Sequence, residues 1–302
     1  MAPQALLPLE GRTIAVAGFG HMGEPIAQRL RAEGAQVAVV EPNNTRAAAA
    51  SHLGFQVIRP VDVNAEAWVL SLPNADSVEA LLFGNELATL EGALIVDMST
   101  IGIDEAKRFH DRLAKLGGLY VDAPVSGGRA RAAQGSLTMM VGTTENAHPL
   151  IEPIVSAIGG RVHYLGSPGS GAAVKIANNL LAIGNLVLLG AAMRIVESQD
   201  IDPETFLEVI ELGSGGSRIA SAKSEKIINH DFSPSFSLSL AAKDVGLAVG
   251  ALGSNAGPVV EALSTIVSEI ASSEESEEDI ARLAEVSREA KGGVCPNVRS
   301  SG

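Results

Sequence analysis

The first half of the chain alternates short apolar runs with segments that repeat apolar residues at helical spacing. An apolar run of this length bounded by polar residues is typical of a buried strand, and alternation with helices favours a parallel sheet. The pattern therefore predicts a doubly wound α/β domain. Its predicted strands are residues 13–17, 36–40, 68–72, 93–98, 119–121, 137–142 and 161–164, and its predicted helices are residues 25–31, a segment ending at 82, 104–116 and 145–157.

Beyond residue 171 the pattern is helical without strands. A loop rich in Ser, Pro and Gly at residues 167–171 favours a boundary between domains at 1–166 and 167–302. The second domain is predicted to be all-helical and joined to the first by a long helix. Its further helices are predicted at residues 203–212, with Asp202 as cap, at 218–228, around Lys243 and Asp244, at 257–272 and at 277–290, with a frayed tail from 292.

The long helix begins with Lys175 and Asn179, which project from the same helical face because they are four residues apart. Residues 180–196 are almost entirely apolar, which predicts a helix buried nearly all round, with Ser170 as its N-cap. A lysine at the open end of such a helix can be held in a cleft and have its pKa tuned. Taken alone, it is more often a lysine that extends to solvent.

Three glycines, Gly18, Gly20 and Gly23, separate the first predicted strand from the first predicted helix. In that position the spacing indicates a dinucleotide-binding turn. The first glycine permits the tight turn, the second the approach of a diphosphate, and the third close packing of the helix. Glu41 ends the next strand, where an acid accepts ribose hydroxyls; this favours NAD, while Arg46 leaves NADP possible. The alternative for Glu41 is a solvated acid at a strand end.

Two further pairs of residues follow predicted strands, Leu72-Pro73 and Ser99-Thr100. Ligands of parallel sheets bind beyond the carboxyl ends of the strands, so these residues are candidate walls and hydroxyl donors for the nicotinamide. A Ser or Thr at such a point is often only a helix cap.

The turn Ser126-Gly127-Gly128 follows the strand at 119–121. Its successive backbone N–H groups and its hydroxyl would suit a carboxylate ligand. By itself such a turn is more often an ordinary loop.

Composition narrows the partners. The 302 residues are 46% hydrophobic, 19% charged and 3% aromatic, and their net charge of −13 argues against nucleic acid or an anionic membrane. The single cysteine, Cys295, permits no internal disulfide, which fits a reducing compartment. We expect no secretory signal at the N-terminus and no membrane span, because Asn185 interrupts the best candidate, and we therefore expect a cytoplasmic protein. No histidine, cysteine or nucleophile motif indicates a metal site or covalent catalysis.

Six motifs in order resemble the β-hydroxyacid dehydrogenase family, which includes 3-hydroxyisobutyrate dehydrogenase and tartronate semialdehyde reductase. They are GFGHMG from Gly18, SLP from Ser71, DMST from Asp97, DAPVSGG from Asp122, GSGAAVKIANN from Gly169 and FSLSLAAKD ending at Asp244. The resemblance covers nearly the whole chain. It implies a Rossmann domain, a long helix and an all-helical domain, with homodimers or homotetramers built from the helical parts.

The resemblance also implies roles for individual residues, all at matching positions of this sequence. The catalytic acid/base would be Lys175, with Asn179 positioning it or the substrate. The substrate carboxylate would be held by Ser126, Gly127 and Gly128. The cofactor would be held by Gly18, Gly20, His21, Met22, Gly23, Glu41, Leu72, Pro73, Thr100 and Lys243.

The implied reaction is hydride transfer between NAD(P) and a short 3-hydroxy acid or its semialdehyde, while Lys175 takes or returns the hydroxyl proton. Partial burial would help, because desolvation disfavours the charged amine. Glu41 replaces the Asp of many NAD-dependent relatives. Two alternatives remain: an NADPH-dependent imine reductase, whose relatives generally lack the lysine, and a dinucleotide-binding protein without catalysis.

Overall fold

The computed structural model describes residues 8–62, 64–84, 90–144, 147–272 and 275–289. The chain divides into two compact units, Met1–Ala177 and Asn178–Gly302. The division lies inside the long helix rather than in the loop at 167–171, because the first turns of that helix pack on the first unit: Ala172 belongs to its core. Cys295 and the tail from residue 292 lie outside the described residues.

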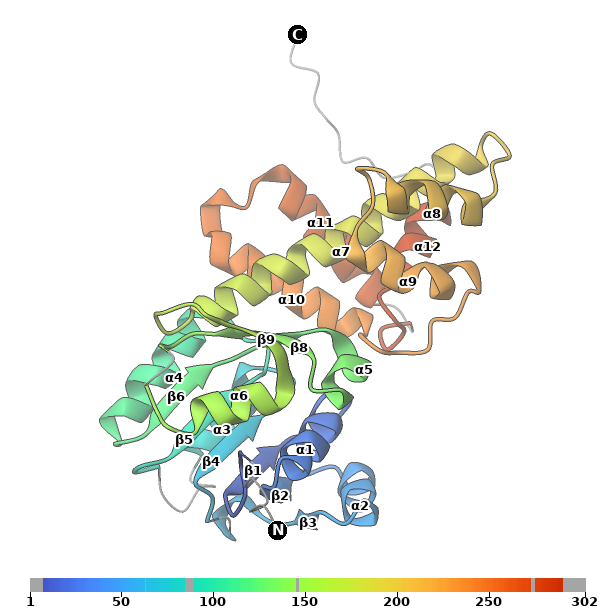
Figure 1. The fold of residues 1–302 in the computed structure, drawn as a ribbon. Helices are drawn as coiled ribbons and strands as arrows, with labels where there is room; N and C mark the ends of the chain where they lie inside the picture. Colours follow the sequence, from blue (N-terminus) through green and yellow to red (C-terminus); the bar gives the residue numbers. More distant parts are fainter. Residues whose placement is uncertain (1–7, 63, 85–89, 145–146, 273–274, 290–302) are drawn as a thin grey trace. The chain divides into compact units, whose positions relative to one another are not determined.

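The first unit contains a six-stranded parallel sheet in the order β3-β2-β1-β4-β5-β6 (Figure 1). This order reverses direction between β1 and β4, which creates the crevice where Rossmann domains bind dinucleotides. The predicted doubly wound fold is therefore confirmed. The strands are β1 (Thr13–Ala17), β2 (Gln36–Val40), β3 (Gln56–Val57), β4 (Ala67–Leu70), β5 (Leu94–Asp97) and β6 (Leu119–Asp122).

Helices cover both faces of this sheet, as alternation along the strands requires. In β1, Ile14 and Val16 belong to one core cluster, while Ala15 and Ala17 belong to another. The helices α1 and α6 contribute to the first cluster, and α3 and α4 contribute to the second. The helices of this unit are α1 (Gly23–Ala32), α2 (Asn44–His52), α3 (Ala75–Phe83), α4 (Ile103–Lys115), α5 (Gly128–Ala133) and α6 (Ile151–Ile158), with a 3₁₀ turn η1 (Pro60–Asp62).

The last predicted strands do not extend the main sheet. A separate three-stranded sheet has the order β7-β8-β9, formed by β7 (Val125–Ser126), β8 (Leu137–Val141) and β9 (Gly159–Tyr164). The residues of β7 pair antiparallel with β8, and β8 pairs parallel with β9. The short strand β7 and the helix α5 escaped prediction because each is too short for a periodic signal.

The second unit is helical. The long helix α7 (Ser170–Glu197) enters it from the first unit, and a buried apolar cluster joins α7 to the other helices. Most predicted bounds agree with the structure, but the last helix starts later than residue 277. The other elements are α8 (Pro203–Leu212), α9 (Arg218–Ile228), α10 (Leu238–Leu252), η2 (Gly253–Asn255), α11 (Gly257–Ala271) and α12 (Arg282–Glu289).

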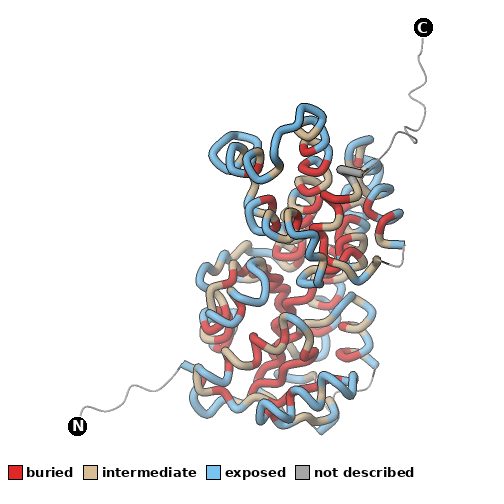
Figure 2. Tube along the Cα trace, turned by 90° about the vertical axis from the view of Figure 1, so that its right-hand side faces the viewer, coloured by how far each residue is buried: buried red, intermediate tan, exposed pale blue. Residues whose placement is uncertain are grey.

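The expectation that α7 is buried nearly all round is wrong. Figure 2 shows exposed positions along the helical unit, and on α7 the side chains of Val174, Leu181, Leu188 and Ile195 are 42%, 67%, 69% and 69% exposed. These residues recur every seven positions and so form one stripe. The sequence pattern could not predict this stripe, because the buried and exposed faces of the helix consist of the same residue types.

The expectation that no segment is long enough for a membrane span is also wrong. Helix α7 has 28 residues and an 18-residue window of mean hydropathy 1.7, so it could span a membrane by length and composition alone. Core helices of globular proteins meet the same two criteria. In this unit, Ile183, Leu186, Leu189 and Met193 of α7 are buried in the helical core.

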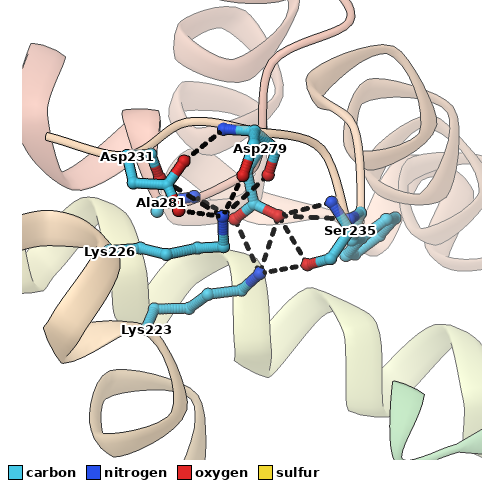
Figure 3. A network of polar contacts seen from close by, with 8 residues as sticks. Lys223, Lys226, Asp231, Ser235, Asp279 and Ala281 are labelled. Atoms are coloured by element: carbon cyan, nitrogen blue, oxygen red, sulfur yellow. Dashed lines mark hydrogen bonds and ion pairs between the residues drawn. The ribbon is translucent and has the colours of Figure 1, made fainter. Parts of the chain in front are cut away.

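A buried ion pair ties together separate segments of the second unit (Figure 3). The Lys223 ammonium lies 2.6 Å from the Asp279 carboxylate, whose oxygens also accept hydrogen bonds from Ser235 and from the backbone N–H of Phe236 and Ala281. Burial raises the pKa of Asp279, but Lys223, Ser235 and the Ala281 amide outweigh it, so the pKa lies below its usual value. This ion pair fixes the segment that leads into α10.

Replacing Lys223 should therefore destabilise the second unit. Lys223→Met should lower its free energy of unfolding by about 3–5 kcal/mol, because Asp279 is left charged and buried. Lys226→Met is the matched control: it lies on the same helix, and its ion pair with Asp231 is at the surface, so we expect at most about 1 kcal/mol. Urea unfolding checks both, and equal losses would contradict the expectation.

The stability of the native chain should also respond to pH. The lowered pKa of Asp279 gives stability that is present above the unfolded-state pKa and is lost as pH falls through the folded-state pKa. The native chain should therefore lose this contribution to its free energy of unfolding as pH falls below about 3.9, and urea unfolding at several pH values measures the loss.

Candidate active site

The glycine-rich turn between β1 and α1 has room for only some side chains. A Cβ on Gly23 would lie 1.9 Å from the Gly18 carbonyl oxygen, and a Cβ on Gly18, whose φ is +90°, would lie 2.3 Å from the Ser71 carbonyl oxygen. A Cβ on Gly20 would meet nothing within 4 Å. Gly18 and Gly23 are thus required by the turn itself, whereas Gly20 leaves open space of the kind a diphosphate needs.

Glu41, at the end of β2, is buried rather than solvated. Its Oε2 accepts a hydrogen bond of 2.8 Å from the Phe19 amide, and its Oε1 accepts one of 2.8 Å from the Asn43 amide. The Arg46 guanidinium binds both oxygens at 3.1 Å. Burial raises the pKa of Glu41, but these hydrogen bonds outweigh it, so the pKa lies below its usual value. The carboxylate therefore ties β2 to the glycine-rich turn.

Asp97, at the end of β5, supports the Leu72–Pro73 segment through Ser99. The Leu72 amide donates to Ser99 Oγ at 2.9 Å, and the Ser99 side chain in turn bonds to Asp97. The Tyr120 hydroxyl donates to the same carboxylate at 2.6 Å. Burial raises the pKa of Asp97. Thr100 follows this network directly in sequence, so the two predicted cofactor walls share one support.

Asp97 was given no role from the sequence, although an acid that ends an apolar run can indicate a supporting residue at the end of a strand. In the described part of the chain, no group of three or more His, Cys, Asp or Glu side chains is arranged to hold a metal ion. The acids at the sheet edge instead have backbone amides, hydroxyls or a guanidinium as partners.

The Ser126–Gly128 turn joins β7 to α5 through two left-handed residues. Gly127 has φ +140° and Gly128 has φ +71°, conformations that L side chains rarely adopt. Next to them, the Arg129 guanidinium donates one hydrogen bond of 3.2 Å to the His21 carbonyl oxygen and one of 2.7 Å to the Glu24 carboxylate. The predicted carboxylate turn and the glycine-rich turn are therefore brought together within the first unit.

The start of α7 is held by Asp122, not by Ser170. Asp122 Oδ1 accepts the Gly169 amide and Oδ2 accepts the Ala172 amide, both at 2.9 Å. Ser170 is already inside the helix, and its hydroxyl bonds to carbonyl oxygens of Leu165 and Ser167 instead. The predicted N-cap is therefore corrected: a carboxylate from the end of β6 takes that role.

Lys175 belongs to the first unit, one turn after the amide that Asp122 holds, and is partly buried. A Cβ on Gly171 would lie 2.2 Å from the Met140 carbonyl oxygen, so the first turn of α7 rests directly on backbone. Because the same Cβ would also lie 2.8 Å from the Asp122 carbonyl oxygen, this packing fixes the start of the helix that carries Lys175 relative to both β8 and β6.

Asn179 and Lys243 belong to the second unit, where Asp244 links them. Asn179 Nδ2 donates a hydrogen bond of 2.5 Å to the Asp244 carboxylate. The Oδ1 of Asn179 accepts a hydrogen bond of 3.0 Å from the Asn178 side chain. Lys243 Nζ lies 3.0 Å from the other oxygen of Asp244. Because a carboxylate only accepts hydrogen bonds, Asp244 determines which way the Asn179 amide faces. The buried Asp244 is a further residue that sequence reasoning left without a role.

The chain matches the sequences of two known families of domains and of several dehydrogenases and reductases. Residues 13–166 match the sequence model of the NAD binding domain of 6-phosphogluconate dehydrogenase, and residues 169–287 match that of NAD-binding of NADP-dependent 3-hydroxyisobutyrate dehydrogenase. The 2-(hydroxymethyl)glutarate dehydrogenase of Eubacterium barkeri is 38% identical over 241 residues, covering 78% of this chain and 80% of its own. The 2-hydroxy-3-oxopropionate reductase of Escherichia coli is 32% identical, covering 77% and 81%.

The chain is also similar in fold to solved structures. The 3-hydroxyisobutyrate dehydrogenase of Mycobacterium tuberculosis, solved with L-serine, has a TM-score of 0.80 at 27% identity and covers 92% of this chain and 99% of its own. An imine reductase from Pseudomonas has a TM-score of 0.58 at 21% identity, covering 91% of this chain and 98% of its own. The second likeness extends to the fold alone.

Two substitutions of the same kind should separate folding from cofactor binding. Gly23→Ala places a methyl group against a backbone oxygen and should prevent the turn from forming, with loss of soluble protein or a large fall in melting temperature. Gly20→Ala meets open space, so it should fold normally but bind NADH at least about tenfold more weakly. Thermal melts and NADH fluorescence titration check both. Normal NADH binding by Gly20→Ala would contradict the assignment.

Proposed function

The chain belongs to the β-hydroxyacid dehydrogenase family, and from this premise we propose that it transfers a hydride between NAD(P) and a short 3-hydroxy acid or its semialdehyde. One observation carries the proposal. Asp122 holds the start of the helix that bears Lys175, and it lies four residues before Ser126, where the Ser126–Gly128 turn begins. The amine that we assign to proton transfer and the turn that we assign to the carboxylate thus both lie on segments next to one buried acid.

The first unit fits a nicotinamide dinucleotide. The space at Gly20 would admit the diphosphate, the adjoining start of α1 offers backbone amides, and we assign Glu41, with Arg46 bound to it, to the side of the adenosine ribose. A bound NAD(P) supplies the carbon that accepts or donates the hydride. His21, Met22, Leu72, Pro73, Thr100 and Lys243 complete the residues that we assign to the cofactor.

The substrate is a small carboxylate in our proposal. Successive N–H groups in a turn with left-handed residues, such as Gly127 and Gly128, can together receive one carboxylate, and Ser126 adds a hydroxyl. The neighbouring Arg129 strengthens the local positive potential, although Glu24 partly neutralises it. The names of the relatives, which act on hydroxymethylglutarate and 2-hydroxy-3-oxopropionate, support this substrate class.

Lys175 is assigned the proton transfer. In oxidation its neutral amine takes the hydroxyl proton as hydride leaves the carbon, and in reduction its ammonium returns it. Asn179, one turn further along α7, has its amide orientation fixed by Asp244 and would orient the reacting oxygen. Hydride and proton leave the same alcohol group, so the reaction balances without a metal or a covalent intermediate.

The two alternatives have less support. The imine reductase shares only the fold with this chain, whereas the hydroxyacid dehydrogenase relatives exceed 30% identity. A dinucleotide-binding protein without catalysis would need neither a partly buried Lys175 nor the left-handed Gly127 and Gly128. We assign the reaction to the cytoplasm on the grounds of the sequence alone.

We further propose a homo-oligomer that forms through the exposed stripe of α7. The stripe from Val174 to Ile195 extends for about 31 Å at 1.5 Å per residue. A continuous apolar stripe of this length is typical of a surface covered by another helix. Two copies of the same helix offer one another identical repeats of seven residues, which favours a symmetric dimer as the basic assembly.

Lys175→Ala tests the proposed chemistry. It should lower turnover by about 10²–10⁴-fold while NADH binding and melting temperature stay unchanged, because general acid–base catalysis is lost and the fold is kept. Turnover is measured on a panel of short 3-hydroxy acids and semialdehydes, each with NAD and NADP. Lys115→Ala, at the end of the remote helix α4, is the control. Near-normal turnover by Lys175→Ala would exclude the role.

Leu188→Glu tests the oligomer. A charge in the centre of the stripe should dissociate it, because a carboxylate cannot be buried there without a partner. The substitution Gln199→Glu adds the same charge at an exposed position beyond α7 and should leave the assembly intact. Light scattering after size exclusion measures the mass of each, and a native chain that is already monomeric would overturn the proposal.

A further inference from the structure

We propose that Arg46 decides the choice of cofactor: it is the residue that allows a site with an acid at Glu41 to accept the 2′-phosphate of NADP. The inference rests on the proposed function only in requiring that the first unit binds a nicotinamide dinucleotide. The acid alone would favour NAD, because its charge repels a phosphate. The contacts around it change that expectation.

The carboxylate of Glu41 has no acceptor position left for a ribose hydroxyl. A carboxylate offers about four lone-pair positions. On Oε1 they are taken by the Asn43 amide and Arg46 Nη2, and on Oε2 by the Phe19 amide and Arg46 Nε. A hydroxyl of NAD can therefore reach Glu41 only if one of these donors leaves.

Only the arginine can leave without changing the fold. The Phe19 amide is part of the glycine-rich turn, and the Asn43 amide belongs to the N-cap residue of α2. The backbone of Arg46 is itself held by Asn43, whose side chain accepts its amide at 3.1 Å. The side chain of Arg46 is 51% exposed while that of Glu41 is 2% exposed, so the guanidinium is the mobile partner of a fixed acid.

The bound guanidinium creates a phosphate receptor over the acid. Arg46 uses its Nε and one Nη2 hydrogen on Glu41, and three of its five N–H donors remain on the opposite edge. That edge matches two oxygens of a phosphate, and the positive charge lies between the phosphate and Glu41. In this arrangement Glu41 holds the arginine in place and no longer repels the ligand directly.

The two cofactors therefore make opposite demands on one side chain. NADP uses Arg46 where it lies, bridging the acid and the 2′-phosphate. NAD has to displace Arg46 from Glu41 before its ribose hydroxyls can bind, and this displacement costs affinity. Removing Arg46 should weaken the binding of NADP and leave the binding of NAD unchanged or make it tighter. A purely structural role of Arg46 would not change the ratio of the two dissociation constants in this way.

The test measures dissociation constants of NADH and NADPH by nucleotide fluorescence, without a hydroxy acid. Arg46→Ala should weaken NADPH by about ten- to a hundredfold, because charge-assisted hydrogen bonds to phosphate are lost. NADH should bind equally or more tightly. Arg46→Gln, which keeps the length of the side chain but not the charge, should shift the ratio in the same direction and serves if Arg46→Ala folds poorly.

Arg12→Ala is the matched control. Arg12 is also 51% exposed and is paired with an acid, Glu66, but it precedes β1 at the opposite edge of the sheet. Its removal should leave the NADPH to NADH ratio unchanged. A ratio that stays constant in both Arg46 variants, or a native chain that binds neither nucleotide, would overturn the inference.

The outcome is separate from that of the proposed reaction. If no short hydroxy acid is turned over but the ratio shifts as expected, the reaction is wrong and the role of Arg46 stands. If turnover depends on Lys175 while the ratio of the NADPH and NADH dissociation constants does not depend on Arg46, the proposed reaction stands and the role of Arg46 is wrong.

Discussion

The structure depends most on one carboxylate, that of Asp122, which accepts two backbone amides at the start of α7. A helix begins with amides that have no partner within it, and a buried start would be costly without an acceptor. Asp122 ends β6, so the strand and the helix cannot shift relative to one another. Gly171 has no side chain to keep them apart. The placement of Lys175 follows from this contact.

The same device recurs along the carboxyl edge of the sheet. Glu41 after β2 and Asp97 after β5 are also buried, and each binds backbone amides of a neighbouring loop directly or through Ser99. Burial alone would raise the pKa of each acid, and the donors around Glu41 are sufficient to reverse that effect. Three acids thus tie the loops at this edge of the sheet to the strands that precede them, and loops held in this way lose little conformational entropy when a ligand binds.

Sequence reasoning predicted the fold well where the signal is local. Gly18 and Gly23 have tight backbone contacts, and Asp202 caps α8 as its position before Pro203 indicates. It failed where a partner is distant in sequence: Ser170 has the residue type of a cap, but Asp122 takes the position. The exposed stripe of α7 was also unreadable, because leucine is found on both its faces. The assigned site residues stay predictions until they are tested by substitution.

The helical unit uses buried carboxylates in the same way. Asp279 accepts amides of the segment before α10 and is neutralised by Lys223, and α10 presents Lys243 and Asp244. Asp244 then orients Asn179 on α7. The two side chains of this unit that we assign to the site, Asn179 and Lys243, are therefore both held by one buried acid, Asp244.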